Sequence, residues 1–243
     1  MTVARMIRLL LGAGLVVFSS CGPTSMPLPM PTRTPDAANS SLEVSKTSAL
    51  ADNSDTIELT VTVKDSTGAP VNEAVVALSA SGRGTPVDAS GRTSTGSDGK
   101  LTLALRSNVA ETRTVTATVT TPSGPVALAT KPVVTFLAGP LANVRFTVQP
   151  SQVRVGAPIT PAVVLAAEDA QGNMVASSEV TVSVRLVRTT MAGGLSGGAA
   201  KRVTDGGVVF DALTIANAEA GVALRAETSN GAAAESMTFT VVP

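Results

Sequence analysis

The chain contains no histidine, no tryptophan and no tyrosine, and it has only five phenylalanines among its 243 residues. Histidine is the commonest general base and the commonest metal ligand, so its absence removes the usual parts of hydrolytic and metal-dependent enzymes. Tryptophan and tyrosine are the usual stacking platforms for bases and sugar rings, and neither is present. The composition therefore predicts a protein that is not an enzyme and has no catalytic residues, no metal site, no cofactor and no small-molecule substrate.

Charge is also scarce. Charged residues make up 15% of the chain, and 18 lysines and arginines balance 18 acidic residues. Because the basic residues are scattered singly, the sequence shows no basic patch for nucleic acid or anionic lipid. Apolar residues reach 44%, so a core can be built from Val, Leu, Ile and Ala. Segments rich in β-branched residues, separated by Gly, Pro, Asn and Asp, favour strands and turns over helices.

The single cysteine follows a segment that is typical of an export signal. Arg5 and Arg8 precede an apolar run over residues 9–18, and two small residues at 19–20 stand directly before Cys21. An apolar run of this length is too short to span a bilayer, which takes about 20 residues. With no second cysteine, no intramolecular disulfide can form, and the folded part must be stable through packing alone.

This arrangement resembles the lipobox of bacterial lipoproteins, although Phe18 and Ser20 stand where that family usually has Leu and a Gly or Ala. The resemblance implies a signal peptide over 1–20, cleaved before Cys21, whose sulfur then receives a diacylglycerol. It also implies a membrane anchor with palmitate-type acyl chains, and Gly22 in place of Asp favours sorting to the outer membrane. The alternative is an ordinary secretory signal in which Cys21 has no special role.

A proline-rich stretch follows. Residues 22–40 contain five prolines and few large apolar side chains, a composition that favours extended polyproline conformations. The lipidated cysteine and this stretch, residues 21–40, are therefore predicted to form a flexible tether.

The rest of the chain repeats one plan. "VKDSTGAPV" at 63–71 and "AEDAQGNMV" at 167–175 share an acid three residues before a glycine, and "SDGK" at 97–100 matches "TDGG" at 204–207. The repeat is about one hundred residues long, which is the size of one immunoglobulin-like sandwich. Apolar residues alternate with polar ones on both sides of each motif, at Ile57, Leu59, Val61 and Val63 and at Val163, Leu165, Ala167, Val180, Val182 and Val184. We predict an all-β fold with two tandem immunoglobulin-like Greek-key β-sandwiches, over 41–138 and 139–243.

The first repeat resembles bacterial Ig-like domains of the invasin and intimin type. The resemblance lies in "DTIELTVTVKDSTGAPV" at 55–71, "SDGKLTLALRS" at 97–107 and "TVTATV" at 114–119. The second repeat is more distantly similar to Ig-like repeats of large bacterial surface proteins. The resemblance implies an Ig-like scaffold, which in the invasin type largely forms a stalk, and it does not imply a role in host invasion.

Three features suggest sites and have structural interpretations. Asp65 and Asp169 could be metal ligands, but neither is followed by the alternating oxygen ligands of a calcium loop, so we predict aspartate turns. The stretch "GGLSGGAAK" at 193–201 lacks the Lys-Ser/Thr pair of a phosphate loop and is predicted to be a flexible loop. Lys64 lies on the polar face of its strand, which disfavours an intramolecular isopeptide bond. Four phenylalanines are predicted to be core residues, namely Phe136, Phe146, Phe210 and Phe239.

The sequence thus predicts a lipid-anchored protein of the cell envelope. We expect attachment to the outer membrane through Cys21, at the cell surface or on the periplasmic face, and a protein or surface partner for the two Ig-like domains, which act as a spacer or adhesion module. The alternative function is a carbohydrate or cell-wall binding module, which the lack of Trp and Tyr disfavours.

Overall fold

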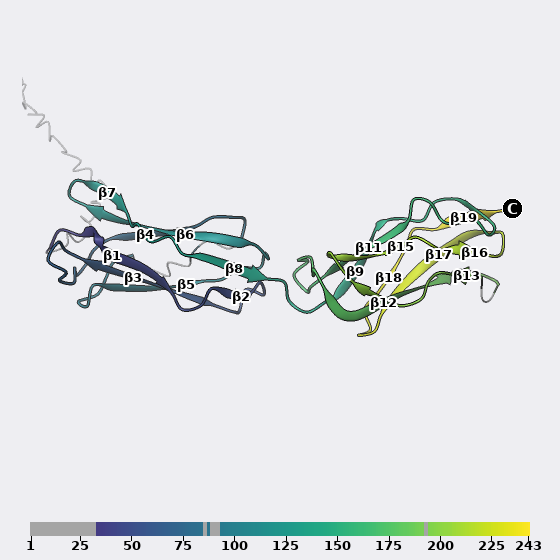
Figure 1. Ribbon diagram of the computed structural model, residues 1–243, viewed down its shortest axis with the longest axis horizontal. Helices are drawn as coiled ribbons and strands as arrows, with labels where there is room; N and C mark the ends of the chain where they lie inside the picture. The colour runs from purple at the N-terminus through teal and green to yellow at the C-terminus, as the bar shows by residue number, and fades with distance from the viewer. Residues whose placement is uncertain (1–32, 85–86, 88–92, 192–193) are drawn as a thin grey trace, which may run out of the picture. The chain divides into compact units, whose positions relative to one another are not determined.

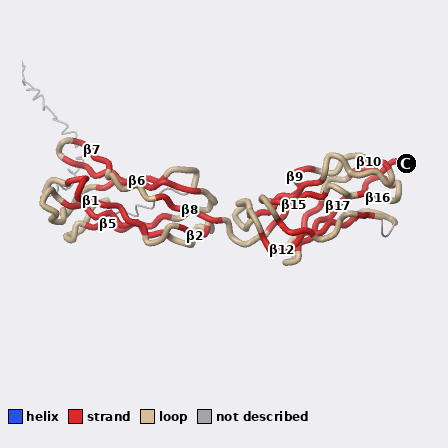
Figure 2. The backbone as a smooth tube through the Cα atoms, viewed as in Figure 1, coloured by secondary structure: helices blue, strands red, loops and turns tan. Residues whose placement is uncertain are grey.

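The computed structural model describes residues 33–84, 87, 93–191 and 194–243. The predicted signal peptide, Cys21 and most of the predicted tether lie outside the described residues. Within the described part of the chain there are nineteen β-strands and no α-helix, as the strand colouring of Figure 2 shows. No described helix is long and apolar enough to cross a membrane. The predicted all-β fold is confirmed.

The first sandwich has eight strands, drawn from purple to teal in Figure 1. They are β1 (Asp36–Val44), β2 (Ser48–Leu50), β3 (Ile57–Lys64), β4 (Val76–Ala80), β5 (Lys100–Leu105), β6 (Thr112–Thr121), β7 (Gly124–Ala127) and β8 (Val133–Leu137). One sheet has the order β1-β3-β5, and the other has the order β2-β8-β6-β4 with β7 paired to β6. All pairs are antiparallel except β2 with β8, which is parallel.

Eleven strands form the second sandwich. They are β9 (Asn143–Val148), β10 (Val153–Arg154), β11 (Val163–Glu168), β12 (Ser178–Val187), β13 (Leu195–Ser196), β14 (Lys201–Val203), β15 (Gly207–Phe210), β16 (Thr214–Ile215), β17 (Glu219–Thr228), β18 (Ala233–Glu235) and β19 (Phe239–Val242). One sheet has the order β15-β11-β9, and the other has the order β10-β19-β17-β12-β14 with β18 paired to β17. The short strands β13 and β16 pair with each other.

The two sandwiches share one topology. The three-stranded sheet consists of β1, β3 and β5 in the first sandwich and of β9, β11 and β15 in the second, and a short parallel strand borders the other sheet in each, β2 beside β8 and β10 beside β19. The hairpin β6-β7 has its counterpart in β17-β18. The internal repeat that the sequence predicts is therefore present in the order of the strands, and each copy includes one parallel pair.

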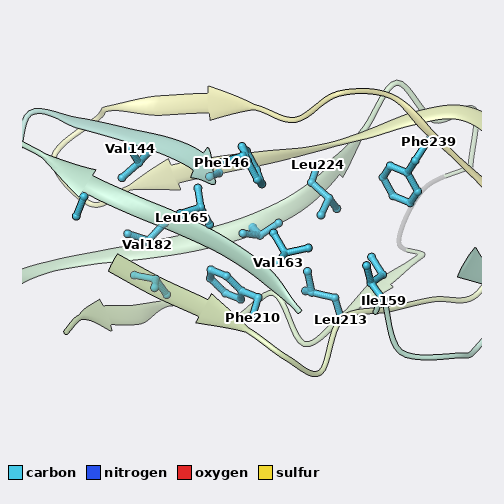
Figure 3. Close-up of a cluster of buried hydrophobic side chains, with 14 of the residues drawn as sticks. Val144, Phe146, Ile159, Val163, Leu165, Val182, Phe210, Leu213, Leu224 and Phe239 are labelled. Carbon is cyan, nitrogen blue, oxygen red and sulfur yellow. The ribbon is translucent and has the colours of Figure 1, made fainter. Parts of the chain in front are cut away.

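Alternation of apolar and polar residues explains why these segments form strands. Along β3, residues 57, 59, 61 and 63 are buried and the residues between them are not, because successive side chains of a strand point to opposite faces. Each sandwich has its own core, and no residue belongs to both. Figure 3 shows the core of the second, with Phe146, Phe210 and Phe239 among its aliphatic side chains. All four phenylalanines predicted for the core are buried.

The first sandwich begins earlier than the sequence suggests. Strand β1 starts at Asp36, within the stretch predicted as tether. Its register with β3 shifts between Asp36 and Ser41. The hydroxyl of Ser40 bridges this irregularity, since it accepts the Lys64 amide at 3.0 Å and donates to the Asp36 carbonyl at 2.6 Å. Composition misses this strand because its first residues, DAANS, bury little apolar surface.

Candidate functional site: two aspartate turns and the exposed sheet faces

The hairpin that follows β3 is organised by Asp65. Oδ1 of this carboxylate accepts the amides of Thr67 and Ala69 at 2.9 and 3.0 Å and the Thr67 hydroxyl at 2.6 Å. Gly68 has a φ of 83°, which a glycine adopts at low cost. Oδ2 accepts the guanidinium of Arg33 at 2.8 Å. The Thr67 hydroxyl and the Arg33 guanidinium hold the pKa of the Asp65 carboxyl well below its ordinary value.

Asp169 organises the hairpin after β11 in the same way. Its Oδ1 accepts the amides of Gln171 and Asn173 at 2.9 and 2.8 Å. Its Oδ2 accepts the Gly139 amide at 2.8 Å and the Asn173 side-chain amide at 3.0 Å. Burial alone would raise the pKa of Asp169, but these four hydrogen bonds outweigh it and lower the pKa. The predicted aspartate turns are thus present in both repeats.

Each turn also bonds to an asparagine near the start of its own sandwich, a contact that the sequence pattern did not predict. The side-chain amide of Asn39 donates to the Asp65 carbonyl at 3.1 Å, and that of Asn143 donates to the Asp169 carbonyl at 3.4 Å. Both asparagines precede their aspartate by 26 residues. This equal spacing of Asn and Asp was the available signal. These asparagine contacts connect the first strand of each sandwich to the hairpin. The donor to Oδ2, which is Arg33 in the first sandwich and Gly139 in the second, adds a further connection.

The two aspartates direct their carboxylate oxygens to donors within the fold. Every carboxylate oxygen of Asp65 and Asp169 already accepts at least one hydrogen bond from its own sandwich. A cation would have to displace those donors, and carboxylate groups bind calcium in sets rather than singly. In the described ranges, no group of three or more His, Cys, Asp or Glu side chains could hold a metal ion.

A buried arginine is the main charged feature of the first core. Arg113, on β6, is 1% exposed, and its guanidinium donates to the carbonyls of Ser81 and Ala80 at 2.6 and 3.3 Å. It also lies 3.7 Å from the Glu111 carboxylate, which accepts the Gly84 amide at 2.7 Å. Burial lowers the pKa of Arg113. The cluster connects residues 80–84 to β6.

The glycine-rich loop at 193–201 serves close packing. From Gly194 onward, where the structure describes it, its Gly198 carbonyl accepts the Val184 amide at 2.9 Å. A Cβ on Gly198 would lie 2.1 Å from the Val184 carbonyl oxygen, and one on Gly197 would lie 2.2 Å from that of Ala212. The glycines are therefore required by the approach of two backbones.

The exposed sheet faces differ most between the sandwiches. On β6, the outward residues are five threonines, the threonine face: Thr112, Thr114, Thr116, Thr118 and Thr120. The outward positions of the adjoining β4 and β8 also carry no charge. The corresponding face of the second sandwich is ionic, because Arg185 of β12 and Arg225 of β17 both donate to Glu227, at 3.0 and 2.9 Å. The same fold thus carries an uncharged face in the first sandwich and an ionic face in the second.

Comparison with known proteins agrees with this architecture for the first sandwich. Residues 39–137 match the family model of the bacterial Ig-like domain (group 1). The match covers nearly the whole first sandwich, and the second, which lies outside it, repeats the order of the main strands. No curated protein matches the chain significantly.

Several solved structures of bacterial adhesins are similar to the chain. InvE of Yersinia pseudotuberculosis is 19% identical, over 86% of this chain and 60% of its own, with a TM-score of 0.43. InvD of the same organism is 20% identical, over 86% and 58%, with a TM-score of 0.46. Invasin, a bacterial integrin-binding protein, is 19% identical, over 85% and 41%, with a TM-score of 0.46. The chain therefore spans less than two thirds of the length of each.

Proposed function

We propose that the chain is a lipid-anchored protein of the bacterial cell envelope, whose two Ig-like sandwiches act as a spacer or as a protein-adhesion module. The anchor is Cys21. One observation supports it most strongly: the only cysteine of the chain directly follows an export-type segment and directly precedes a proline-rich stretch that leads into a segment matching the bacterial Ig-like domain. Acyl chains on Cys21, at about 0.8 kcal/mol per buried methylene, hold such a protein on a membrane.

The described residues support a scaffold rather than an enzyme. The aspartates that resemble sites are engaged within the fold, and among the described residues no buried side-chain polar atom lacks a hydrogen-bond partner. Buried, unsatisfied or clustered titratable groups are what active sites usually require. What the sandwiches offer a partner is therefore their outer surface, namely the loops at their ends and the exposed sheet faces.

The tether sets how near the first sandwich stays to the membrane. Arg33, which is bound to Asp65, marks where the chain joins the fold. The residues from Cys21 to Arg33, extended at about 3.1 Å per residue, reach roughly 40 Å. The anchored sandwich would stay within that distance of the lipid surface, close enough for a spacer role and too short to cross a thick cell wall.

Mass spectrometry of the mature N-terminus tests the anchor. The full chain and its Cys21→Ala variant are expressed in a bacterium with lipoprotein processing, and Ser19→Ala serves as a control that keeps the cysteine. We expect an N-terminal peptide that begins at acylated Cys21 in the wild type and the control, and a membrane-free or unprocessed chain in the variant. An unmodified wild-type chain that is cut elsewhere and released into the medium would refute the anchor.

Protease treatment of intact cells then places the protein. Degradation by external protease, with a periplasmic marker left intact, would support the cell surface and direct the search toward extracellular partners. Protection would support a role on the periplasmic face, as a spacer or in binding envelope components.

A further inference from the structure

The three-stranded sheet of the second sandwich carries an apolar groove on its outer face. The groove is about 490 Å³ in volume, and we define it by Val164, Ala166, Met174, Gly207 and Val209. Ala166 pairs with Gly207 across the strands β11 and β15, and Val164 pairs with Val209. The two small residues form its floor. Val209 is 49% exposed and Met174 is 64% exposed, so its walls are large apolar groups left in water.

The first sandwich shows that the fold does not need this groove. The same register positions there are Thr62 paired with Lys100 and Thr60 paired with Thr102. Each pair stands at the same place relative to the aspartate turn and to the Asp-Gly turn as its counterpart in the second repeat. A polar, charged face is thus compatible with the identical sheet. The apolar groove is a specific property of the second sandwich, and exposed apolar surface of this kind commonly marks an interaction site.

Strand addition at the neighbouring edge is obstructed. The Lys201 ammonium donates to the Val209 carbonyl at 2.8 Å, so a backbone acceptor on the outer edge of β15 is already occupied. A lysine in this position is a common device against pairing with another strand. An occupant of the groove therefore approaches the face of the sheet and not its edge.

The charges around the groove indicate what that occupant is. Lys201 and Arg202, which line it, pair with Asp211 at 3.3 Å and with Glu179 at 2.5 Å. Both acids are well exposed, 72% and 85% by side chain. Asp205 also lines the groove, so the rim presents both signs, which complements a surface carrying the same mixed pattern rather than a strongly basic or acidic partner. In a two-fold arrangement one patch meets its own copy, so each base can face an acid of the other copy.

We propose that the apolar groove is a face-to-face contact between two copies of this chain. Val209 and Met174 of one copy cover the Ala166–Gly207 floor of the other, and the rim charges pair across the two-fold axis. The sheet has three strands about 4.8 Å apart, so the patch is much smaller than the roughly 800 Å² per partner of a standard stable interface. The contact is therefore weak in dilute solution and populated where copies are concentrated, as on a shared membrane.

Photo-crosslinking in cells tests this contact without dilution. The full chain carries a benzophenone amino acid in place of Val209 and is co-expressed with two different epitope tags. The matched control has the same group in place of Thr102, the equivalent position of the first sandwich. We expect a product of twice the chain mass that carries both tags from the Val209 position and none from Thr102. A product containing another protein, no product, or equal products at both positions would overturn the proposal.

A second variant separates contact from folding. With the crosslinker in place of Met174, adding Val209→Lys should reduce the two-tag product about tenfold, because a charge then enters the centre of an apolar contact. Val209 is half exposed, so thermal unfolding should not change. An undiminished product would contradict the role of the groove. The product is scored in whichever fraction contains the chain, membrane or medium, so loss of the proposed lipid anchor is recognised separately from loss of self-association.

Discussion

The two sandwiches share their strand order and the bonding of their aspartate turns, yet they differ on their outer faces. The first presents an uncharged threonine face on β6 and polar residues on its three-stranded sheet. The second presents ion pairs on β17 and an apolar groove on its three-stranded sheet. What both copies keep is the buried alternation and the Asn–Asp contacts. The comparison indicates that these internal features specify the fold, while the faces are free to specialise.

The largest expected effect comes from the separate cores. Phe136→Ala and Phe210→Ala each remove a buried ring from one core, and such truncations cost about 3–5 kcal/mol. Because the cores share no residue, each variant should destabilise its own sandwich and leave the other nearly unchanged. Hydrogen exchange with mass spectrometry reports the two regions separately. Equal loss of protection in both sandwiches would show that they unfold as one cooperative unit.

The two aspartate turns should differ in how much they stabilise their sandwiches. Asp169→Ala leaves the amides of Gly139, Gln171 and Asn173 without their acceptor at a site that is 1% exposed, and we expect a loss of about 2–3 kcal/mol. Asp65→Ala should cost less, because its partner Arg33 has a side chain that is 53% exposed and can return to water. Denaturant unfolding of both variants measures this order. A larger loss for Asp65→Ala would contradict it.

Acid should weaken both turns through the same linkage. The pKa of each aspartate is lowered in the fold, so each contributes stability above the unfolded-state pKa of about 3.9, which is lost as pH falls toward the folded pKa. Thermal unfolding between pH 7 and pH 2 should show stability falling below about pH 4. Asp65→Asn should flatten this dependence in the first sandwich only. An unchanged pH profile would mean that other carboxylates dominate.

The smallest effect is expected on the threonine face. Thr116→Val removes an exposed hydroxyl whose cross-strand partner is Ser79, at 2.8 Å. Both can bond to water instead, and β-branching is retained, so stability should change by no more than about 0.5 kcal/mol. Thermal unfolding against wild type measures it. A loss well above that value would show that the threonine face stabilises the sheet rather than only covering it.

Much of the fold follows from local patterns. The alternation at Ile57, Leu59, Val61 and Val63 predicts β3 because burial on one face is enough to define a strand. The turns at Asp65 and Asp169 follow from side-chain chemistry that acts within four residues.

Contacts between residues far apart in the sequence could not be predicted from local patterns. Oδ2 of Asp65 accepts a hydrogen bond from Arg33, and Oδ2 of Asp169 accepts one from the Gly139 amide. Both contacts depend on the assembled sandwich. Arg113 occupies an apolar position of an alternating strand, and only the packed carbonyls of Ser81 and Ala80 explain its burial. The apolar groove likewise requires the register that pairs Ala166 with Gly207.

If the repeated aspartates are parts of a scaffold and not metal ligands, calcium should not change the stability of the protein. Thermal unfolding of the full chain in millimolar calcium and in EDTA tests it directly. A site bound at about one hundred times its dissociation constant would add about 2.7 kcal/mol of stability. We predict no difference between the two conditions for the wild type. A calcium-dependent rise in melting temperature that Asp65→Ala or Asp169→Ala abolishes would instead show that the aspartates bind calcium.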